Sequence, residues 1–397
     1  MIIIEIIFFI LTIYYVFCML YVVVFSFAGL FYKKPYYPEA AKYRKIAILV
    51  PAYKSDNVII QLAENVLQQD YPDFELIVIA DSIEKKTLNA LKEMPITVME
   101  FADNNRTKAL ALNAIMGRLP NNYDIALILD SDNLIKETNY LRKINDVFDS
   151  GIKALQTHRT AKNTNTALAM LDAASEEINN HIFRRGHSTL GLSSALIGSA
   201  MAFDYSLYKE QMGHISSSGE DKELEMRLLK MKVEVVYSDN LIVLDEKTQQ
   251  SKVFVNQRVR WIANQIMHAK NNLFEGFRQL FKGNFDYFDK VMQQLLLPRI
   301  FLIFSILFIT FLTVIFLPFS YGLIWVIIMM MTFTGILISV PKQMYNRQLF
   351  RSLLYLPVGI ILMCWSLFKI KGATKKFHAT EHGIISDNST FARDSKS

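Results

Sequence analysis

Three long apolar stretches constrain this chain more than any other feature. Residues 6–30 carry no charge over 25 positions, residues 295–317 carry a single charge, and residues 321–340 carry none over 20 positions. A helix needs about 20 apolar residues to cross a bilayer. We therefore predict an integral membrane protein and do not expect a purely soluble one.

The two ends of the chain are assigned to the membrane on this basis. Residues 1–32 form a predicted N-terminal transmembrane helix, and residues 295–370 form a predicted C-terminal transmembrane region. Within the second region, the apolar piece at residues 353–368 is only 16 residues long and includes Pro357. That piece therefore either spans the bilayer, re-enters it or lies in the interface. Residues 371–397 form a basic tail.

Basic residues predict which side of the membrane the centre of the chain occupies. Between positions 33 and 45, five lysine or arginine residues stand against one acidic residue, Glu39. Basic loops stay in the cytoplasm, so we expect the N-terminus outside and the central region inside. Only Glu5 is charged ahead of the first apolar stretch. Because that stretch is long and lacks a basic start, we do not expect a cleavable signal peptide.

The composition excludes several classes of protein. Charged residues make up 20% of the chain, which is below the ~25% of an average soluble domain. The net charge of +6 is too small an excess to indicate nucleic-acid binding by itself. The two cysteines, Cys18 and Cys364, lie in apolar stretches. Neither a disulfide framework nor a cysteine-based metal site is expected.

Residues 45–250 alternate between short apolar runs and helical patterns, which is typical of an α/β domain. The runs at 46–50, 75–80, 96–101 and 125–129 predict strands, and the helical patterns occupy 57–69, 83–93, 106–118 and 139–149. Strands that are apolar throughout are buried on both faces, so we predict a mainly parallel sheet covered by helices. Residues 251–294 are amphipathic and mix aromatic with charged residues, which is typical of interfacial helices.

Two of the predicted strands end in carboxylates. Asp81 follows the second strand, and Asp130 and Asp132 follow the fourth. Ligands bind beyond the carboxyl ends of the strands in open α/β sheets. Carboxylate oxygens together with phosphate suit Mg²⁺ or Mn²⁺. Each aspartate taken alone fits a helix cap or a turn as well.

A second acidic motif, Gly219-Glu220-Asp221, precedes a helical pattern at 222–232. In the first turn of a helix, the dipole favours the ionised form of Asp221. An ionised carboxylate beside a substrate can remove a proton from an attacking hydroxyl. A plain acidic N-cap explains the same residues.

The motif Gln257-Arg-Val-Arg260-Trp261 carries cationic and aromatic groups together. Arg260 can bind diphosphate oxygens in a forked geometry, and Trp261 offers a flat face to a sugar ring. The alternative is a basic amphipathic helix whose tryptophan lies among lipid headgroups. Tyr53, which could stack on a base, and Lys108, which could reach phosphate, are weaker signals. A turn and a solvated helix face explain these two better when each is taken alone.

Read in order, these motifs resemble those of membrane-embedded family 2 glycosyltransferases, in particular cellulose, chitin and hyaluronan synthases and their bacterial relatives. The resemblance covers residues 45–270. It implies a GT-A (Rossmann-like) fold for a cytoplasmic domain at 45–250, with flanking transmembrane and interfacial helices in a bacterial inner membrane. It also implies an inverting, metal-dependent hexosyltransferase. Such an enzyme moves a sugar from a nucleotide-sugar, here a UDP-sugar, to a growing polysaccharide, processively and coupled to export.

The resemblance also implies a role for each motif. Asp221 would be the general base. Asp132 and Asp130 would hold Mg²⁺ or Mn²⁺. The donor nucleotide would contact Pro51, Tyr53, Asp81, Lys108, Asp130 and Arg260. The acceptor side would be formed by Gln257, Trp261, Gly198, Ser199 and Glu220.

The sequence departs from the family pattern at three positions. Thr107 replaces the usual glycine before the lysine, Ala80 replaces an aspartate before Asp81, and Gly219 replaces a threonine. None of these changes removes a charge that the chemistry needs. In the tail, residues 377–382, which include Thr380, resemble a gating loop of cellulose synthases.

Other functions fit the same residues. A non-processive transferase would add a single sugar to a lipid-linked or protein acceptor. A membrane regulator would bind the nucleotide-sugar without turnover. A transporter is disfavoured because Arg299 is the only charge within the apolar stretches, and transport sites usually need polar groups there. As partners we expect a donor, a glycan or lipid-linked acceptor and membrane lipids, with a homo-oligomer or export subunits completing a channel, and no nucleic acid.

Overall fold

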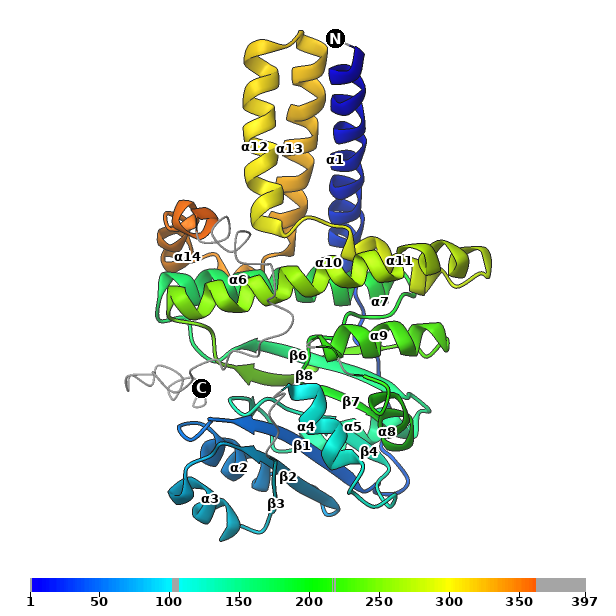
Figure 1. The fold of residues 1–397 in the computed structure, drawn as a ribbon, viewed down its shortest axis with the longest axis vertical. Helices are drawn as coiled ribbons and strands as arrows, with labels where there is room; N and C mark the ends of the chain where they lie inside the picture. The colour runs from blue at the N-terminus through cyan, green and yellow to red at the C-terminus, as the bar shows by residue number, and fades with distance from the viewer. Residues whose placement is uncertain (1, 102–106, 216, 218, 362–397) are drawn as a thin grey trace.

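The structure is a computed structural model that describes residues 2–101, 107–215, 217 and 219–361. Its first half contains α1 (Ile2–Gly29), β1 (Ile46–Tyr53), α2 (Ile59–Leu67), β2 (Phe74–Asp81), α3 (Lys85–Lys92), β3 (Thr97–Glu100), α4 (Lys108–Met116), β4 (Ile125–Ile128), β5 (Leu134–Ile135), α5 (Tyr140–Asp149), β6 (Ala154–Ala161) and α6 (Ala167–Asn180). Its second half contains the π-helix η1 (His181–Gly186), α7 (His187–Thr189), β7 (Met201–Asp204), α8 (Tyr205–Met212), α9 (Glu220–Lys230), β8 (Val236–Asp245), α10 (Ser251–Phe281), α11 (Phe285–Gln294), α12 (Arg299–Phe316), α13 (Phe319–Ser339), the 3-10 helix η2 (Lys342–Met344) and α14 (Arg347–Leu353). Figure 1 shows their arrangement in space.

The strands form one sheet in the order β3-β2-β1-β4-β7-β6-β8-β5. Strands β1 to β4 run parallel to one another, and β6 is parallel to β8. Strand β7 is antiparallel to both β4 and β6, and β5 is antiparallel to β8. The predicted α/β domain with a mainly parallel sheet is confirmed. All four predicted strands and all four predicted helices are present, with their ends shifted by a few residues.

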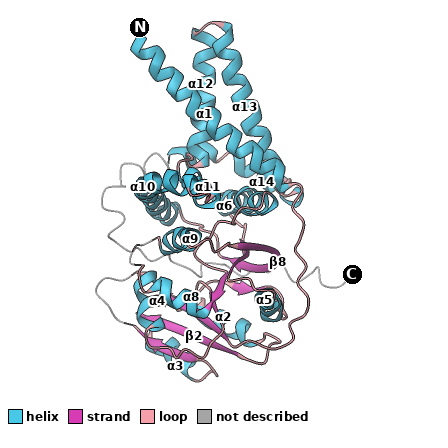
Figure 2. Cartoon of the chain, turned by 90° about the vertical axis from the view of Figure 1, so that its right-hand side faces the viewer, coloured by secondary structure: helices cyan, strands magenta, loops and turns pink. Residues whose placement is uncertain are grey.

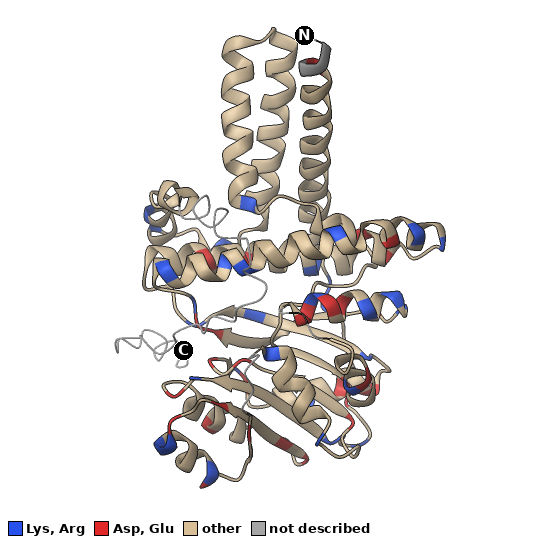
Figure 3. Cartoon of the chain, viewed as in Figure 1, with Lys and Arg blue, Asp and Glu red and all other residues tan. Residues whose placement is uncertain are grey.

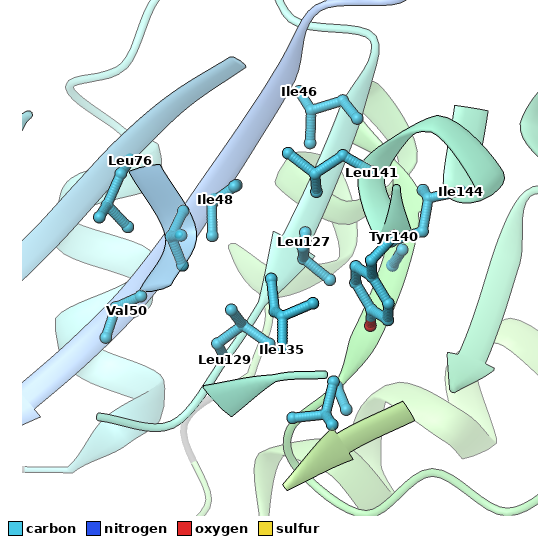
Figure 4. Close-up of a cluster of buried hydrophobic side chains, with 14 of the residues drawn as sticks. Ile46, Ile48, Val50, Leu76, Leu127, Leu129, Ile135, Tyr140, Leu141 and Ile144 are labelled. Carbon is cyan, nitrogen blue, oxygen red and sulfur yellow. The ribbon is translucent and has the colours of Figure 1, made fainter. Parts of the chain in front are cut away.

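The apolar strands bury side chains on both faces of the sheet. Successive residues of a strand point to opposite faces. In β1, Ile48 and Val50 pack with α2 and α5 on one face, while Ala47 and Leu49 pack with α4 and α8 on the other. Figure 4 shows the first of these clusters, in which Tyr140 of α5 lies over the strands. The sheet is thus a rigid platform whose strand ends carry the polar residues.

A layer of helices separates the sheet from three apolar helices. Helices α6, α10 and α11 lie in this layer in both views (Figure 1 and Figure 2). Helix α10 runs unbroken to Phe281. The helix stops before Gly283, whose φ of +72° an L side chain rarely adopts. Gly276 allows α11 to pack closely on α10, because a Cβ there would meet the Val291 side chain at 3.1 Å.

Three helices are long and apolar enough to cross a membrane: Glu5–Gly29, Arg299–Phe316 and Phe319–Ser339. Figure 3 shows them almost free of charged residues along their length. They pack together around Trp325, which is fully buried, and Gly335 of α13 lies against Val22 of α1. Residues 362–397 lie outside the described residues. They include the end of the apolar piece at residues 353–368, the basic tail and Thr380.

Candidate functional site

The carboxyl ends of β1, β2 and β4 bring three predicted residues to one edge of the sheet. Tyr53 and Asp81 are register partners at the ends of β1 and β2, and Asp81 is buried. The loop after β1 is tied to the loop after β4 by a hydrogen bond of 2.8 Å between the hydroxyls of Ser55 and Ser131. The expected nucleobase-binding residues and Asp130 therefore lie at the same edge of the sheet.

Lys108 connects four parts of the chain. It begins α4, which is capped by the Thr107 side chain. Its Nζ lies 2.5 Å from Oδ1 of Asp130, 2.6 Å from the Gly198 carbonyl oxygen and 3.7 Å from Oε1 of Glu220. Burial lowers the pKa of Lys108, but the neighbouring carboxylates of Asp130 and Glu220 outweigh this effect and raise it overall. The ammonium group is thus held charged inside the site.

The Gly198 turn places the acidic start of α9 beside this lysine. Gly198 has φ +85°, where an L side chain is strained. A Cβ at this position would lie 3.9 Å from both Oδ2 of Asp221 and Oε1 of Glu220. Ser199 is fully buried, and its hydroxyl accepts a hydrogen bond of 3.1 Å from Arg159. Five predicted residues (Lys108, Asp130, Gly198, Glu220 and Asp221) therefore converge.

The two acids at the start of α9 differ in their surroundings. Glu220 is only 8% exposed, whereas Asp221 is half-buried. Burial raises the pKa of Glu220 to about 7; Lys108 opposes the rise and the Asp221 carboxylate adds to it. Asp221 lies in the first turn of α9, as predicted.

A ring of charged side chains surrounds the aspartates after β4: Arg159, Asp245 and Lys247. The sequence analysis missed these three residues. Arg159 of β6 lies 3.9 Å from Asp130 and 3.7 Å from Asp245 at the end of β8. Asp245 also pairs at 2.7 Å with the buried Lys247. The sequence signal for Asp245 was an apolar strand that ends in aspartate, as at Asp81. Arg159 gave no such signal, because its partners lie far away in the chain.

The carboxyl groups of Asp132 and Asp245 lie close together in this ring. Asn133 donates to Asp132 at 3.3 Å and to Asp245 at 3.1 Å, so it holds the two carboxyl groups together. Burial raises the pKa of Asp245 well above its usual range; Arg159 opposes this, and Asp132 and Asp130 add to it. Such crowding of oxygen ligands is what Mg²⁺ or Mn²⁺ relieves. The described residues contain no group of three His, Cys, Asp or Glu side chains already arranged for a metal.

Helix α10 carries the predicted Gln257, Arg260 and Trp261. Gln257 is half-buried, and its Oε1 has no hydrogen-bond partner in the described structure. Trp261 is 41% exposed, and the guanidinium of Arg258 lies 4.1 Å from the centre of its ring. Arg258 also pairs with Asp172 of α6. One face of the tryptophan is therefore covered, and a sugar ring has only the other face available.

The same helix touches the acidic motif through two residues that the sequence analysis missed. A Cβ at Gly219 would meet Nδ2 of Asn264 at 3.0 Å and Nε2 of His268 at 3.1 Å. Both side chains are buried. The glycine that departs from the family pattern is therefore needed for α10 to approach the loop before Glu220.

Comparisons with known proteins identify the family and the fold of the chain. Residues 44–264, more than half of the chain, match the family described as glycosyltransferase like family 2. No curated protein matches the sequence. The solved structure of the mannosyltransferase PcManGT from Pyrobaculum calidifontis, in complex with GDP-Man and Mn²⁺, is 14% identical. It is similar over 90% of this chain and 96% of its own, with a TM-score of 0.59. The likeness confirms the expected GT-A (Rossmann-like) fold.

Two further solved structures are similar over shorter regions. TarS from S. aureus in complex with UDP is 18% identical, and the match covers 55% of this chain and 64% of that chain with a TM-score of 0.37. Glucosyl-3-phosphoglycerate synthase from Mycobacterium tuberculosis, in complex with Mn²⁺, UDP and phosphoglyceric acid, is 15% identical. That match covers 56% of this chain and 79% of the other, with a TM-score of 0.41.

Proposed function

The chain belongs to the glycosyltransferase-like family 2, and from this premise we propose that it transfers a sugar from a UDP-sugar to a hydroxyl of a glycan acceptor at a membrane surface. One observation carries the proposal. The Lys108 ammonium contacts Asp130, the Gly198 carbonyl and Glu220, and so joins the end of the sheet to the helix that begins with Asp221.

The donor would lie along the carboxyl ends of β1, β2 and β4. Pro51, Tyr53 and Asp81 would contact its nucleobase, because they occupy the ends of two neighbouring strands. Its diphosphate would face Lys108 and Arg260. Cationic groups that are fixed before the reaction stabilise the charge that develops on a departing diphosphate, and this is often the largest catalytic effect.

The acceptor hydroxyl would be activated by Asp221. The carboxylate takes the hydroxyl proton while the oxygen attacks the anomeric carbon from the side opposite the diphosphate. The bond from the anomeric carbon to the phosphate oxygen breaks in the same displacement, so the configuration inverts and UDP leaves. Gly198, Ser199 and Glu220 would border the transferred sugar, with Gln257 and Trp261 on the acceptor side.

A divalent cation fits this chemistry. Asp130 and Asp132 would hold Mg²⁺ or Mn²⁺, with Asp245 close enough to contribute because Asn133 links it to Asp132. The cation supplies Lewis-acid neutralisation of the diphosphate when bound. The solved mannosyltransferase contains Mn²⁺, which supports testing Mn²⁺ first.

We propose that the catalytic domain lies at the cytoplasmic face of a bacterial inner membrane, and the three apolar helices support a position at a membrane. Helices α1, α12 and α13 would span the bilayer, and α10 and α11 would lie at its surface. The exposed aromatic side chains on the second half of α10 and the start of α11 fit such a surface position: Phe274, Phe277, Phe281 and Phe285. Basic residues after the first apolar stretch favour a cytoplasmic catalytic domain.

The length of the product separates two versions of this function. Elongation of a polysaccharide with export needs a polar path through the bilayer. Among the described residues, the space between α1, α12 and α13 is filled by large side chains such as Tyr15, Ile306 and Trp325, all nearly or fully buried. This packing favours addition of a single sugar, or elongation whose export needs further subunits. Analysis of the product by size distinguishes the two.

Release of UDP, or of GDP where GDP-mannose is the donor, by the purified full chain tests the function. We would offer a panel of UDP-sugars and GDP-mannose with Mn²⁺ or Mg²⁺. Asp221→Asn keeps the shape of the side chain and removes the base, so turnover should fall by about 10²–10⁴-fold while the donor still binds. Glu223→Gln, at the next acidic position of α9, is the matched control and should retain activity.

The outcomes of this experiment test the role of Asp221 as the base and distinguish an enzyme from a regulator. Turnover of Asp221→Asn near the wild-type rate would reject the base assignment. Binding of a nucleotide-sugar without turnover by the wild-type chain would favour a regulator over an enzyme.

A further inference from the structure

We infer that the acceptor-binding face of α10 continues for two turns beyond Trp261, and that Nε2 of His268 hydrogen-bonds a hydroxyl of the acceptor sugar beside Asp221. This inference rests on the proposed glycosyltransferase function. It assigns Asn264 and His268, which lie outside the motifs found in the sequence, to the binding of a glycan.

The spacing along α10 places these residues on one stripe. Gln257, Trp261, Asn264 and His268 are separated by four, three and four positions, which is the spacing of neighbours on one face of a helix. The stripe begins at the predicted acceptor residues. It ends where His268 Nε2 would lie 3.1 Å from a Cβ on Gly219, next to the two acids of the site.

His268 is a buried polar group without a protein partner. Its side chain is 5% exposed, and Nε2 has no hydrogen-bond partner among the described residues. Native proteins pair nearly all such atoms, so an unpaired one calls for an explanation. Gln257 Oε1, at the other end of the stripe, is buried and unpaired as well. Two unpaired polar atoms on one helix face are what a polyhydroxyl ligand would satisfy.

Burial favours a neutral imidazole at His268. Burial lowers its pKa, and the carboxylate of Asp221 opposes this effect. A neutral imidazole offers one donor and one acceptor nitrogen, which suits a sugar hydroxyl. A diphosphate would favour a cationic partner instead. The proposed site of the diphosphate is already served by Lys108, whose Nζ lies 3.7 Å from Oε1 of Glu220.

The occupant is therefore the acceptor and not the donor. A hydroxyl held by His268 would fix the orientation of the terminal acceptor sugar, so that a second hydroxyl lies against Asp221. Loss of this hydrogen bond should weaken acceptor binding and leave the reaction of the donor with water unchanged, because water needs no such orientation.

The test compares transfer with hydrolysis of the donor by the full chain in detergent. The probe acceptor is the trisaccharide of the transferred sugar. His268→Phe keeps the ring volume and removes both nitrogens, and we expect the acceptor KM to rise about tenfold. UDP release in the absence of acceptor should stay within about twofold. His268→Gln retains a polar terminus and should recover most of the acceptor affinity. Asn271→Ala, an exposed position on the same helix, is the control.

Each outcome either supports or overturns the role of His268 in acceptor binding. An unchanged acceptor KM in His268→Phe overturns the inference, as does an equal rise of KM for donor and acceptor. If His268→Phe fails to fold, His268→Gln and His268→Ala together still test the inference. An acceptor KM as poor in His268→Gln as in His268→Ala, with normal melting of both, would overturn it. Absence of UDP release from the wild-type chain would instead reject the proposed function.

Discussion

The Nζ atom of Lys108 lies 2.5 Å from Oδ1 of Asp130, so a cation from the start of α4 neutralises the first acid after β4. Burial raises the pKa of Asp130, but Lys108 and Arg159 outweigh this effect and lower it overall. The lysine therefore keeps Asp130 ionised, and it also holds the Gly198 turn through its carbonyl oxygen.

Replacing this lysine should damage catalysis. Lys108→Met keeps the length of the side chain and leaves Asp130 and Glu220 without their shared cation. We expect sugar transfer to fall by about 10²–10³-fold, the range seen when a fixed electrostatic contact is removed, with weaker binding of UDP by calorimetry. Lys92→Met removes a cation from an exposed pair with Glu100 and should leave both measurements unchanged. Transfer within threefold of wild type in Lys108→Met would contradict the placement of the diphosphate.

Glu220 should make the folded chain less stable as the pH rises. Its pKa is about 7 in the folded chain against a usual 4.5, so the carboxyl group is protonated in both states below pH 4.5. Between pH 4.5 and 7 only the unfolded chain gives up the proton, and up to about 3 kcal/mol of stability is lost. Glu220→Gln cannot ionise and should not show this loss.

The measurement is thermal unfolding of both chains in detergent at pH 5 and pH 8. The melting temperature of Glu220→Gln relative to wild type should be higher at pH 8 than at pH 5. Glu223→Gln is the control for the change in charge. Equal differences at the two pH values would show that Glu220 is ionised in the folded chain throughout this range.

The parallel half of the sheet was predictable because its strands are apolar on both faces. Strand β6 was not found, since its centre is polar: Gln156 and Thr157 are fully buried. Their side chains are satisfied by the Ala200 carbonyl and by the Tyr140 hydroxyl. Such partners come from distant parts of the chain, so periodicity alone could not reveal a strand there. The antiparallel direction of β7 depends on the same pairing.

The residues of the candidate site likewise fall into those that local sequence predicts and those that depend on distant parts of the chain. Asp130, Glu220 and Asp221 were predictable because local context, a strand end or a helix start, fixes where they lie. Arg159 and Asp245 act through the pairing of β6 with β8, which no local pattern encodes. Asn264 and His268 lie at helical spacing from Gln257, yet only the approach of α10 to Gly219 shows that this face meets the site.

The ion pair between Arg258 and Asp172 should hold α10 on α6. Both side chains are largely buried, with 14% and 11% exposure. Removing one partner leaves a buried charge, so Arg258→Met should cost about 3 kcal/mol of stability. The double variant with Asp172→Asn should cost less than the sum of the two single variants, by about 2 kcal/mol. Unfolding in denaturant measures all four chains of this cycle. Additive effects would show that the pair contributes nothing beyond its separate parts.

Gly186 should fix the contact between α1 and the catalytic domain. A Cβ at this position would lie 2.2 Å from the carbonyl oxygen of Phe25 in α1. Because a backbone atom cannot give way cheaply, Gly186→Ala should force the π-helix η1 away from α1 and cost at least about 2 kcal/mol. We expect the melting temperature of the purified chain to fall by at least about 4 °C. Gly117→Ala is the matched control, since a Cβ there meets its nearest atom at 3.5 Å. An equal, small effect of both substitutions would show that α1 does not dock against η1 in the native chain.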